Sequence, residues 1–201
     1  MKGLEMPQGF RGSGRRLACA SAGLALAAFA AQAIAHESQQ PDAPSVDLAG
    51  RPRATAPPRE IVAYSGPHAP GTIVVSTEER RLYYVLPGNQ AVKYGIGVGR
   101  PGFEWSGTQT IVMKREWPSW SPPPQMIRRR PDLPRFMPGG PANPLGARAM
   151  YLGGTLYRIH GSNEPESIGR AVSSGCIRMT NEDVTDLYER VQIGARVIVQ
   201  R

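Results

Sequence analysis

Apolar residues along this 201-residue chain fall in short runs rich in Val, Ile, Tyr and Thr. Turn residues such as Pro87-Gly88-Asn89 separate these runs. Runs of this kind are typical of β-strands, because β-branched and aromatic side chains pack well on a pleated surface. The predicted strands are Thr72 to Ser76, Leu82 to Leu86, Ala91 to Val98, Thr108 to Arg115, Ala149 to Leu152, Leu156 to His160 and Arg196 to Gln200. We expect the first two of these strands to form a hairpin around Thr77 to Arg80.

A single helix is predicted near the C-terminus. Thr180 precedes Asn181-Glu182-Asp183, which is the pattern of an N-cap followed by an acidic first turn. Apolar residues then follow at helical spacing, at Val184, Leu187, Tyr188 and Val191. We expect Gly194 to end this helix. The whole pattern predicts a mainly β fold of curled mixed sheets, packed as a sandwich or barrel-like domain, with one C-terminal helix and a proline-rich insertion.

The predicted insertion runs from Pro118 to Pro144 and contains nine prolines, which exclude regular helix and central strand. One interpretation is a lid, in which apolar side chains line a groove over a site and arginines face an acidic substrate. The other is that the apolar side chains only hold the loop in place and the arginines are solvated. The residues concerned are Trp117, Trp120, Phe136 and Met137, with Arg128, Arg129, Arg130 and Arg135.

Three glycines, Gly95, Gly97 and Gly99, alternate along one face of a predicted strand. A phosphate-binding loop would need a helix directly after them, and no helical pattern follows. The glycines therefore predict close packing of the backbone against a neighbouring segment.

Residues 1–35 have the organisation of a secretory signal peptide. A basic region precedes an Ala- and Leu-rich run from Leu17 to Ala31, and cleavage after Ala33 or Ala35 satisfies the small-residue rule. The alternative is an uncleaved membrane anchor, because the apolar run is just long enough to span a bilayer. Residues 36–68 are rich in Pro, Ala, Ser and charge and predict a flexible linker, which leaves 69–201 as the folded domain.

Cleavage would remove Cys19 and leave Cys176 as the only cysteine, which excludes an intramolecular disulfide and a multi-cysteine zinc site. A catalytic thiol needs a base within hydrogen-bond reach and donors for the oxyanion. His160 is the candidate base, and Ser174 and Gly175 place small residues and backbone N–H groups just before the sulfur. The alternative is that Cys176 is a small buried hydrophobe and His160 an unrelated strand residue.

This stretch resembles the L,D-transpeptidases with a YkuD-type catalytic domain. In that family a H-G pair precedes a segment of the form S-H-G-C-[IV]-R-[ML]. This chain has His160-Gly161 and then Ser173-Ser174-Gly175-Cys176-Ile177-Arg178-Met179. Ser174 departs from the pattern, since many members carry a second histidine there. Weaker likenesses at Gly71 to Ser76, Gly95 to Gly99 and Asn143 to Gly146 extend the resemblance over residues 69–201.

The resemblance implies acyl transfer on peptidoglycan, with neither a metal nor an organic cofactor. Cys176 would attack the carbonyl between the third residue and the terminal D-alanine of a tetrapeptide donor stem, and carbapenems would mimic that donor. An acceptor amine from another stem or from a lipoprotein lysine would resolve the thioester. His160 would lower the pKa of the thiol and move protons, and the carbonyl of Gly161 would orient the imidazole. The N–H groups of Gly175 and Cys176 would hold the oxyanion.

Arg178 and Ser174 are the candidate substrate-binding residues under this resemblance. Guanidinium groups bind carboxylates with a two-pronged geometry, so Arg178 would position a stem-peptide carboxylate or the cysteine loop itself. The departure at Ser174 concerns the oxyanion geometry or the substrate contacts rather than the reaction.

The formal net charge is +8, and the chain stays basic without residues 1–35, because only four of its 24 Lys and Arg lie there. A basic surface indicates nucleic acid, an anionic membrane or an acidic polymer as a partner. Export argues against nucleic acid as the partner. Contact with a membrane would then come only from an uncleaved signal peptide. Bacterial cell wall, with carboxylates on its stem peptides, fits best.

Other enzyme classes fit the order of residues less well. Papain-like and NlpC-type peptidases carry their cysteine before the histidine, and sortases place the histidine much farther upstream. No S-x-x-K or K-T-G motif of a serine D,D-transpeptidase occurs in the sequence. Two alternatives remain open: an L,D-carboxypeptidase that hydrolyses the same bond, or a catalytically inactive secreted wall-binding protein.

We predict that residues 1–35 are removed on export and that the protein acts in the periplasm or the cell wall. The apolar run directs secretion, and the small residues after it present a cleavage site. N-terminal sequencing of the exported protein should give a start at Ile34 or His36. A start at Met1 would contradict the cleavage.

Overall fold

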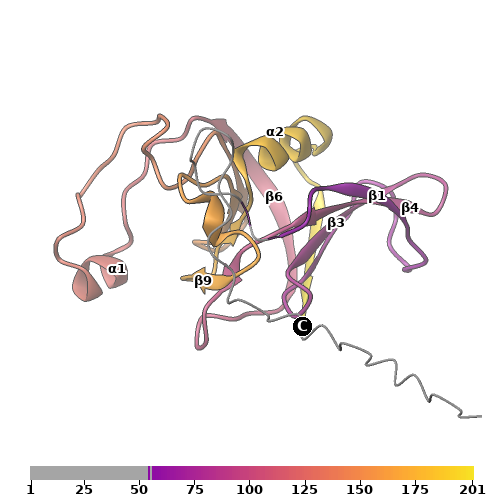
Figure 1. The fold of residues 1–201 in the computed structure, drawn as a ribbon, viewed down its shortest axis with the longest axis horizontal. Helices are drawn as coiled ribbons and strands as arrows, with labels where there is room; N and C mark the ends of the chain where they lie inside the picture. Colours follow the sequence, from indigo (N-terminus) through magenta and orange to yellow (C-terminus); the bar gives the residue numbers. More distant parts are fainter. Residues whose placement is uncertain (1–53, 55) are drawn as a thin grey trace, which may run out of the picture. The chain divides into compact units, whose positions relative to one another are not determined.

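The computed structural model describes Ala54 and residues 56–201. The predicted signal peptide, with Cys19, and the predicted linker as far as residue 53 lie outside the described residues. Within the described part, the chain forms a nine-stranded mixed sheet, a two-stranded sheet and a few short helices (Figure 1). The predicted mainly β fold is confirmed. No described helix is both long and apolar enough to cross a membrane.

Most strands are short, and β6 is the longest. In chain order they are β1 (Glu60–Ala63), β2 (Ile73–Ser76), β3 (Arg81–Leu86), β4 (Gln90–Gly95), β5 (Val98–Gly99), β6 (Gly107–Glu116), β7 (Arg148–Leu152), β8 (Arg158–His160), β9 (Ala171–Ser173), β10 (Ile177–Arg178) and β11 (Arg196–Gln200). The helical segments of the described chain are α1 (Pro124–Arg129), the 3-10 turn η1 (Pro165–Ser167) and α2 (Asn181–Arg190).

Strand β6 connects the two halves of the large sheet, whose strand order is β1-β4-β3-β2-β11-β6-β7-β8-β10. Residues 107–110 of β6 pair with β11, whereas residues 111–116 pair with β7, and the register shifts between Ile111 and Met113. A shift of this kind bends a strand and increases its twist. The sheet therefore curls at β6, so that both halves share one core.

The hydrophobic core lies between this curled sheet and helix α2. Ile73, Val75 and Leu82 from β2 and β3 are fully buried in it. Helix α2 contributes Val184 and Leu187, which are also fully buried, and it packs against β7 and β8 (Figure 1). This packing holds the N-terminus of α2 close to the end of β8, where the candidate histidine lies.

Several of the predicted strands begin and end close to the predicted residues. Strands β2 and β3 form the expected hairpin through the turn at residues 77–80. Strand β8 ends at His160, and β11 spans Arg196–Gln200 as predicted. The last strand lies in the middle of the sheet, parallel to β2, so the C-terminal segment is a structural part of the core.

The predicted helix is confirmed at its start and wrong at its end. Thr180 is the N-cap, and its hydroxyl accepts a hydrogen bond from the Asp183 N–H at 3.1 Å. The helix stops at Arg190, before Gly194, because Val191 has an extended backbone and its side chain is fully buried in the core.

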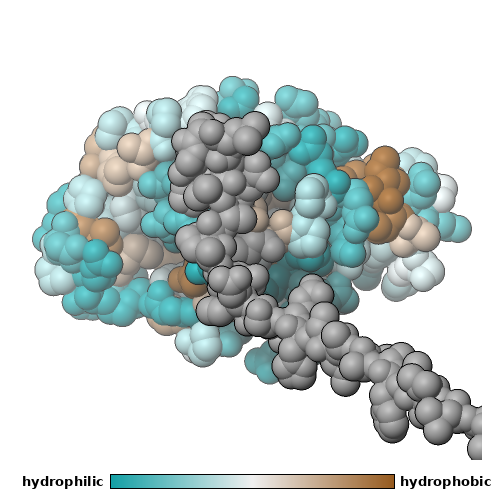
Figure 2. Space-filling model, viewed as in Figure 1, coloured by the Kyte–Doolittle hydropathy of each residue, from teal (hydrophilic) through white to brown (hydrophobic). Residues whose placement is uncertain are grey.

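The predicted flexible linker over residues 36–68 is wrong in its C-terminal part. Strand β1 pairs antiparallel with β4, with Glu60 opposite Lys93 and Ala63 opposite Gln90. Ile61 is 65% exposed, so backbone hydrogen bonds to a sheet edge, rather than burial, order this segment. Figure 2 shows a hydrophobic patch over β1 with hydrophilic surface around it. A pattern of apolar residues is a poor guide to a strand that buries so little.

The insertion contains one short helix, which corrects the prediction that its prolines exclude helix. Helix α1 begins at Pro124, where the missing N–H costs nothing because first-turn N–H groups have no partner in the helix. The rest of the insertion is irregular, as predicted, apart from a bridge between Trp120 and Met137. Figure 1 shows α1 at the far end of this excursion from the sheet.

The glycines around β5 pack closely against other backbone, as predicted. A Cβ atom on Gly97 would lie 2.8 Å from the carbonyl oxygen of Ser167. The Gly97 N–H donates to the carbonyl of Arg178 at 2.8 Å, and the Arg178 N–H donates to the carbonyl of Gly97 at 2.9 Å. This segment therefore lies directly against the residues that follow the candidate cysteine.

We predict that Thr180→Ala lowers the free energy of unfolding by about 1 kcal/mol, because the Asp183 N–H loses its partner. Thr180→Ser keeps the hydroxyl and should stay close to the parent. Urea unfolding followed by circular dichroism measures both variants. Equal losses would show that the methyl group of Thr180, and not the cap, stabilises the start of the helix.

Candidate active site

A two-residue parallel ladder brings the candidate cysteine and histidine together. In it Ile177 of β10 lies opposite Ile159 of β8, and Arg178 lies opposite His160. Side chains alternate between the faces of a sheet, so Ile159 and Ile177 point into the core, where both are buried. The opposite face carries the polar and charged side chains of the two strands and of the residue before β10. They are Arg158, His160, Cys176 and Arg178.

The imidazole of His160 is buried and fixed in orientation. Its Nδ1 lies 2.6 Å from the carbonyl oxygen of Gly161, so Nδ1–H donates to that oxygen and Nε2 is left as the free base. Burial, and after it the positive charge of Arg178, lower the pKa of His160 to about 3, although the hydrogen bond to Gly161 acts in the opposite direction. The imidazole is therefore neutral near neutral pH.

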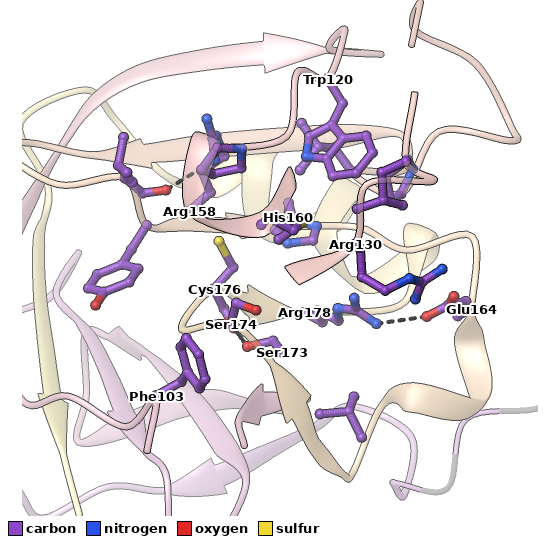
Figure 3. A pocket seen from close by; sticks show the side chains of 18 of the residues that line it. Phe103, Trp120, Arg130, Arg158, His160, Glu164, Ser173, Ser174, Cys176 and Arg178 are labelled. Atoms are coloured by element: carbon purple, nitrogen blue, oxygen red, sulfur yellow. Dashed lines mark hydrogen bonds and ion pairs between the residues drawn. The ribbon is translucent and has the colours of Figure 1, made fainter. Parts of the chain in front are cut away.

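The thiol of Cys176 points toward Arg158 and His160 (Figure 3). Burial raises its pKa, and hydrogen bonds and charge from Arg158, with the charge of Arg178, offset this only in part. A neutral His160 lends no charge to a thiolate. His160 is not among the groups that lower the pKa of this thiol, so the pair is uncharged at rest, with the imidazole buried and the thiol half-buried.

Hydrogen bonds and two aromatic rings hold the loop that carries the cysteine. Ser173 Oγ donates to the carbonyl of Cys176 at 2.6 Å and accepts from the Gly175 N–H at 3.1 Å. Trp105 stacks on Tyr157 with 4.8 Å between ring centroids, and its Nε1 donates to the carbonyl of Gly175 at 2.7 Å. The loop is thus fixed on both sides before any substrate binds.

Gly175 has a structural reason to be glycine that the sequence did not indicate. Its φ is +105°, and a Cβ atom would collide with the ring of Tyr157. Because Ser173 already takes its N–H, the predicted oxyanion contact of Gly175 is wrong for this conformation. The N–H of Cys176 has no hydrogen-bond partner within the described residues and remains the candidate oxyanion donor.

The two predicted substrate-binding residues already have protein partners. Ser174 Oγ accepts a hydrogen bond from Arg100 Nη1 at 3.3 Å. Arg178 Nη1 donates to Glu164 Oε2 at 2.8 Å, in an ion pair that Figure 3 shows at one side of the pocket. A substrate carboxylate would have to compete with Glu164 for Arg178. The side-chain hydrogen bonds of Arg178 go to Glu164 and Ser167, which lie outside the cysteine loop, so both predicted roles stay predictions.

A cavity of about 610 Å³ is lined by Cys176 and His160. Its volume is typical of ligand pockets. The insertion forms part of its wall, which fits the lid interpretation for some of the predicted residues and contradicts it for others. Those in the lining are Trp120, Met137, Arg129 and Arg130. Those outside it are Trp117, Phe136, Arg128 and Arg135.

Arg158 is the site residue that the sequence pattern leaves out. Its Nε is buried and has no hydrogen-bond partner among the described residues, while its Nη1 donates to the carbonyl of Leu156 at 3.0 Å. It lies in the pocket lining with Cys176. Strand alternation could have identified it, because every second residue of a strand shares a face and Arg158 is two residues before His160.

Two asparagines fix the segments around His160. Asn181 Oδ1 accepts from the N–H groups of Ala147 at 2.9 Å and Ser162 at 3.3 Å, which joins α2 to the segments before β7 and after β8. Asn143 is 1% exposed, and its amide donates to the carbonyl of Pro138 at 2.8 Å. It therefore holds the C-terminal end of the insertion in place. The sequence predicts Asn181 at the start of the helix, but it indicates neither of these side-chain contacts.

The described domain thus presents a thiol and an imidazole on one face of a curled β-sheet, in a pocket with several arginines. Among the described residues, no group of three or more His, Cys, Asp or Glu could hold a metal ion. Residues 70–199 match the family model YkuD, the L,D-transpeptidase catalytic domain. The chain belongs to this family, and the resemblance seen in the sequence is confirmed.

Two relatives illustrate the match. Over 132 residues the chain is 42% identical to "Probable L,D-transpeptidase ErfK/SrfK" of Escherichia coli (strain K12), which covers 62% of this chain and 42% of that protein. Over 133 residues it is 47% identical to "Putative L,D-transpeptidase YqjB" of Bacillus subtilis (strain 168). That match covers 63% of this chain and 69% of that protein. The chain spans less than half the length of ErfK/SrfK.

A solved structure supports the fold. An L,D-transpeptidase from Mycobacterium smegmatis superposes with a TM-score of 0.53 at 21% identity, covering 65% of this chain and 58% of that chain. At this identity the likeness concerns the fold alone.

We predict that the pKa of Cys176 lies above the value of about 8.5 for a free cysteine, because burial disfavours the thiolate. Alkylation by iodoacetamide should therefore be slow at neutral pH and accelerate in alkaline solution. Arg158→Gln should move the midpoint of the alkylation rate against pH to a still higher pH, because Arg158 lowers the pKa of the Cys176 thiol. As a control, His160→Gln should move the midpoint little. Fast alkylation at neutral pH that declines only in acid would indicate a preformed ion pair and contradict the neutral resting state.

Proposed function

We propose that this protein is a peptidoglycan L,D-transpeptidase that transfers an acyl group through Cys176. The observation that supports this most strongly is the shared face of β8 and β10, which sets the thiol beside a buried, oriented imidazole in a pocket. Glu164 is the only carboxylate among the described lining residues, against five guanidinium groups, and stem peptides carry carboxylates. The arginines are Arg100, Arg129, Arg130, Arg158 and Arg178.

The first half-reaction follows from the neutral resting pair. As the sulfur of Cys176 bonds to the carbonyl carbon between the third residue and the terminal D-alanine of the donor stem, Nε2 of His160 takes the thiol proton. The Cys176 N–H donates to the oxygen that becomes negative. The carbon–nitrogen bond then breaks, the leaving D-alanine amine takes the proton from His160, and a thioester remains on Cys176.

The second half-reaction returns the site to its resting state. An amine from another stem, or from a lipoprotein lysine, attacks the thioester carbon and gives a proton to His160. The carbon–sulfur bond breaks, an amide forms, and the sulfur of Cys176 recovers the proton from His160. If water attacks instead, the same steps yield a tripeptide and the enzyme acts as an L,D-carboxypeptidase.

The hydrogen bond between His160 and Gly161 matters most in the middle of each half-reaction. The imidazolium that forms there is disfavoured by burial and by the charge of Arg178. Donation from Nδ1–H to the Gly161 carbonyl opposes both effects, because a charged donor strengthens this bond. The low basicity of His160 makes the imidazolium short-lived, so it returns its proton readily to the leaving group.

We also propose that the protein is exported and acts in the periplasm or cell wall. The signal-peptide pattern of residues 1–35 and the basic charge of the remaining chain support this. Any membrane contact would come from an uncleaved signal.

We predict that the full-length protein converts purified tetrapeptide muropeptides into cross-linked dimers with release of D-alanine. Cys176→Ser should abolish the reaction, because the serine hydroxyl is far harder to ionise than the thiol. His160→Ala should slow acylation by about 10² to 10⁴, which is the usual contribution of a positioned acid or base. Mass spectrometry of the products measures each rate.

The product pattern separates the candidate functions. Tripeptides without dimers would replace the transpeptidase by an L,D-carboxypeptidase, and no product at all would favour an inactive wall-binding protein. Reaction of the serine variant at the parental rate would rule out Cys176 as the nucleophile. Thr180→Ser, a change outside the pocket that keeps the helix cap, serves as the activity control.

A further inference from the structure

Two arginines from separate segments contact the same aromatic ring in the pocket. The guanidinium carbon of Arg100, just after β5, lies 4.3 Å from the centroid of the Phe103 ring. That of Arg129, the last residue of α1, lies 5.0 Å from the same centroid. Phe103 therefore connects the insertion to the segment after β5, and all three residues line the pocket.

Arg100 connects this cluster to the cysteine loop. Arg100 Nη1 donates to Ser174 Oγ at 3.3 Å, and Ser174 is two residues before Cys176. Figure 3 shows Phe103 beside Ser173 and Ser174 on the side of the pocket opposite Trp120. A ligand group between the two guanidinium groups would therefore be close to a carbonyl under attack by the sulfur.

The charges of the two arginines are not balanced by acidic side chains. Within residues 56–201, neither Arg100 nor Arg129 forms an ion pair. By contrast, Arg178 pairs with Glu164 at 2.8 Å and Arg130 pairs with Asp132. Both positive charges lie beside one ring, so an anion that binds both offsets their mutual repulsion as well as forming hydrogen bonds.

We propose that Arg100 and Arg129 form a carboxylate clamp that selects donor peptides with a free carboxylate over peptides in which that group is a carboxamide. This inference rests on the proposed function. A carboxylate only accepts hydrogen bonds and can bind two guanidinium groups at once. A carboxamide is neutral, and its NH₂ group is itself a hydrogen-bond donor. It therefore cannot pair with the N–H donors of a guanidinium group. The clamp therefore rejects the amide by an unpaired contact as well as by lost charge.

The clamp would also tie the insertion to the cysteine loop. Arg129 belongs to the insertion, whereas Arg100 is bound to the cysteine loop through Ser174. A carboxylate that bridges them joins the insertion to the loop that carries Cys176. The neutral peptide forms no such bridge and loses the affinity that the bridge contributes.

The test compares two tetrapeptides that differ only in a carboxylate or a carboxamide on the side chain of the third residue. Their affinities are measured by calorimetry on full-length Cys176→Ser protein, which prevents turnover. We expect the acid peptide to bind about ten- to a hundredfold more tightly, which is the usual value of hydrogen bonds to a charged group. Adding Arg129→Gln to the Cys176→Ser protein should reduce the ratio of the two affinities to about threefold or less. Arg129→Lys should recover only part of it, because lysine lacks the planar fork.

Arg128→Gln is the matched control, because Arg128 is the neighbouring residue of α1 and does not line the pocket. It should keep the parental ratio. Equal affinity of the two peptides for the parent, no binding of the acid peptide, or an equal loss in Arg128→Gln and Arg129→Gln would each overturn the clamp. Turnover by protein with Cys176 intact is measured in parallel. If neither peptide reacts, the proposed function fails, while the affinity ratio still decides whether the clamp exists.

Discussion

The pairing register of β8 and β10 is the constraint on which the site depends. A slip of one residue would turn Cys176 and Arg178 into the core and expose the buried Ile177 in the pocket. Two residues of ladder are too few to fix a register alone. The adjacent backbone supplies the rest: the Met179 N–H donates to the carbonyl of His160 at 2.8 Å, and the two hydrogen bonds between Gly97 and Arg178 hold the other edge of β10. Met179 is fully buried, so the same core that stabilises the fold aligns the thiol with the imidazole.

Burial then decides the charge state of the reacting groups. It raises the pKa of Cys176 and lowers that of His160, so the resting pair carries no charge although arginines surround it. A thiol is far less reactive toward oxidants and electrophiles than a thiolate. Cys176 is the only free cysteine of the described chain, so this neutral state protects the proposed nucleophile. In the proposed reaction proton transfer accompanies attack, and the contact with Gly161 orients His160 for that transfer.

The sequence identifies the parts of the structure that bury apolar surface, and it misses those held mainly by polar contacts. The hairpin of β2 and β3, the start of α2 and the end of β8 at His160 follow from apolar periodicity and capping. Strand β1 does not, because its exposed Ile61 offers no burial and only hydrogen bonds to β4 order it. The motif around Cys176 indicates the nucleophile. Strand alternation places Arg158 on the same face as His160, but the sequence cannot show that β8 pairs with β10, because a two-residue strand has no periodicity from which its partner could be predicted. Nor can it show that Ser173 occupies the N–H of Gly175, a contact that exists only in three dimensions.

The departure of this chain from the family pattern at Ser174 changes the electrostatics beside the nucleophile. A histidine has an ordinary pKa of about 6.5, so its charge would vary with pH near neutrality. Ser174 instead accepts a hydrogen bond from Arg100, so a guanidinium group lies beside the cysteine loop where the family pattern has an imidazole. Because Arg100 and Arg129 lie in a pocket open to solvent, their attraction for an anion is screened by salt. Higher ionic strength should therefore weaken the binding of an anion by these two arginines.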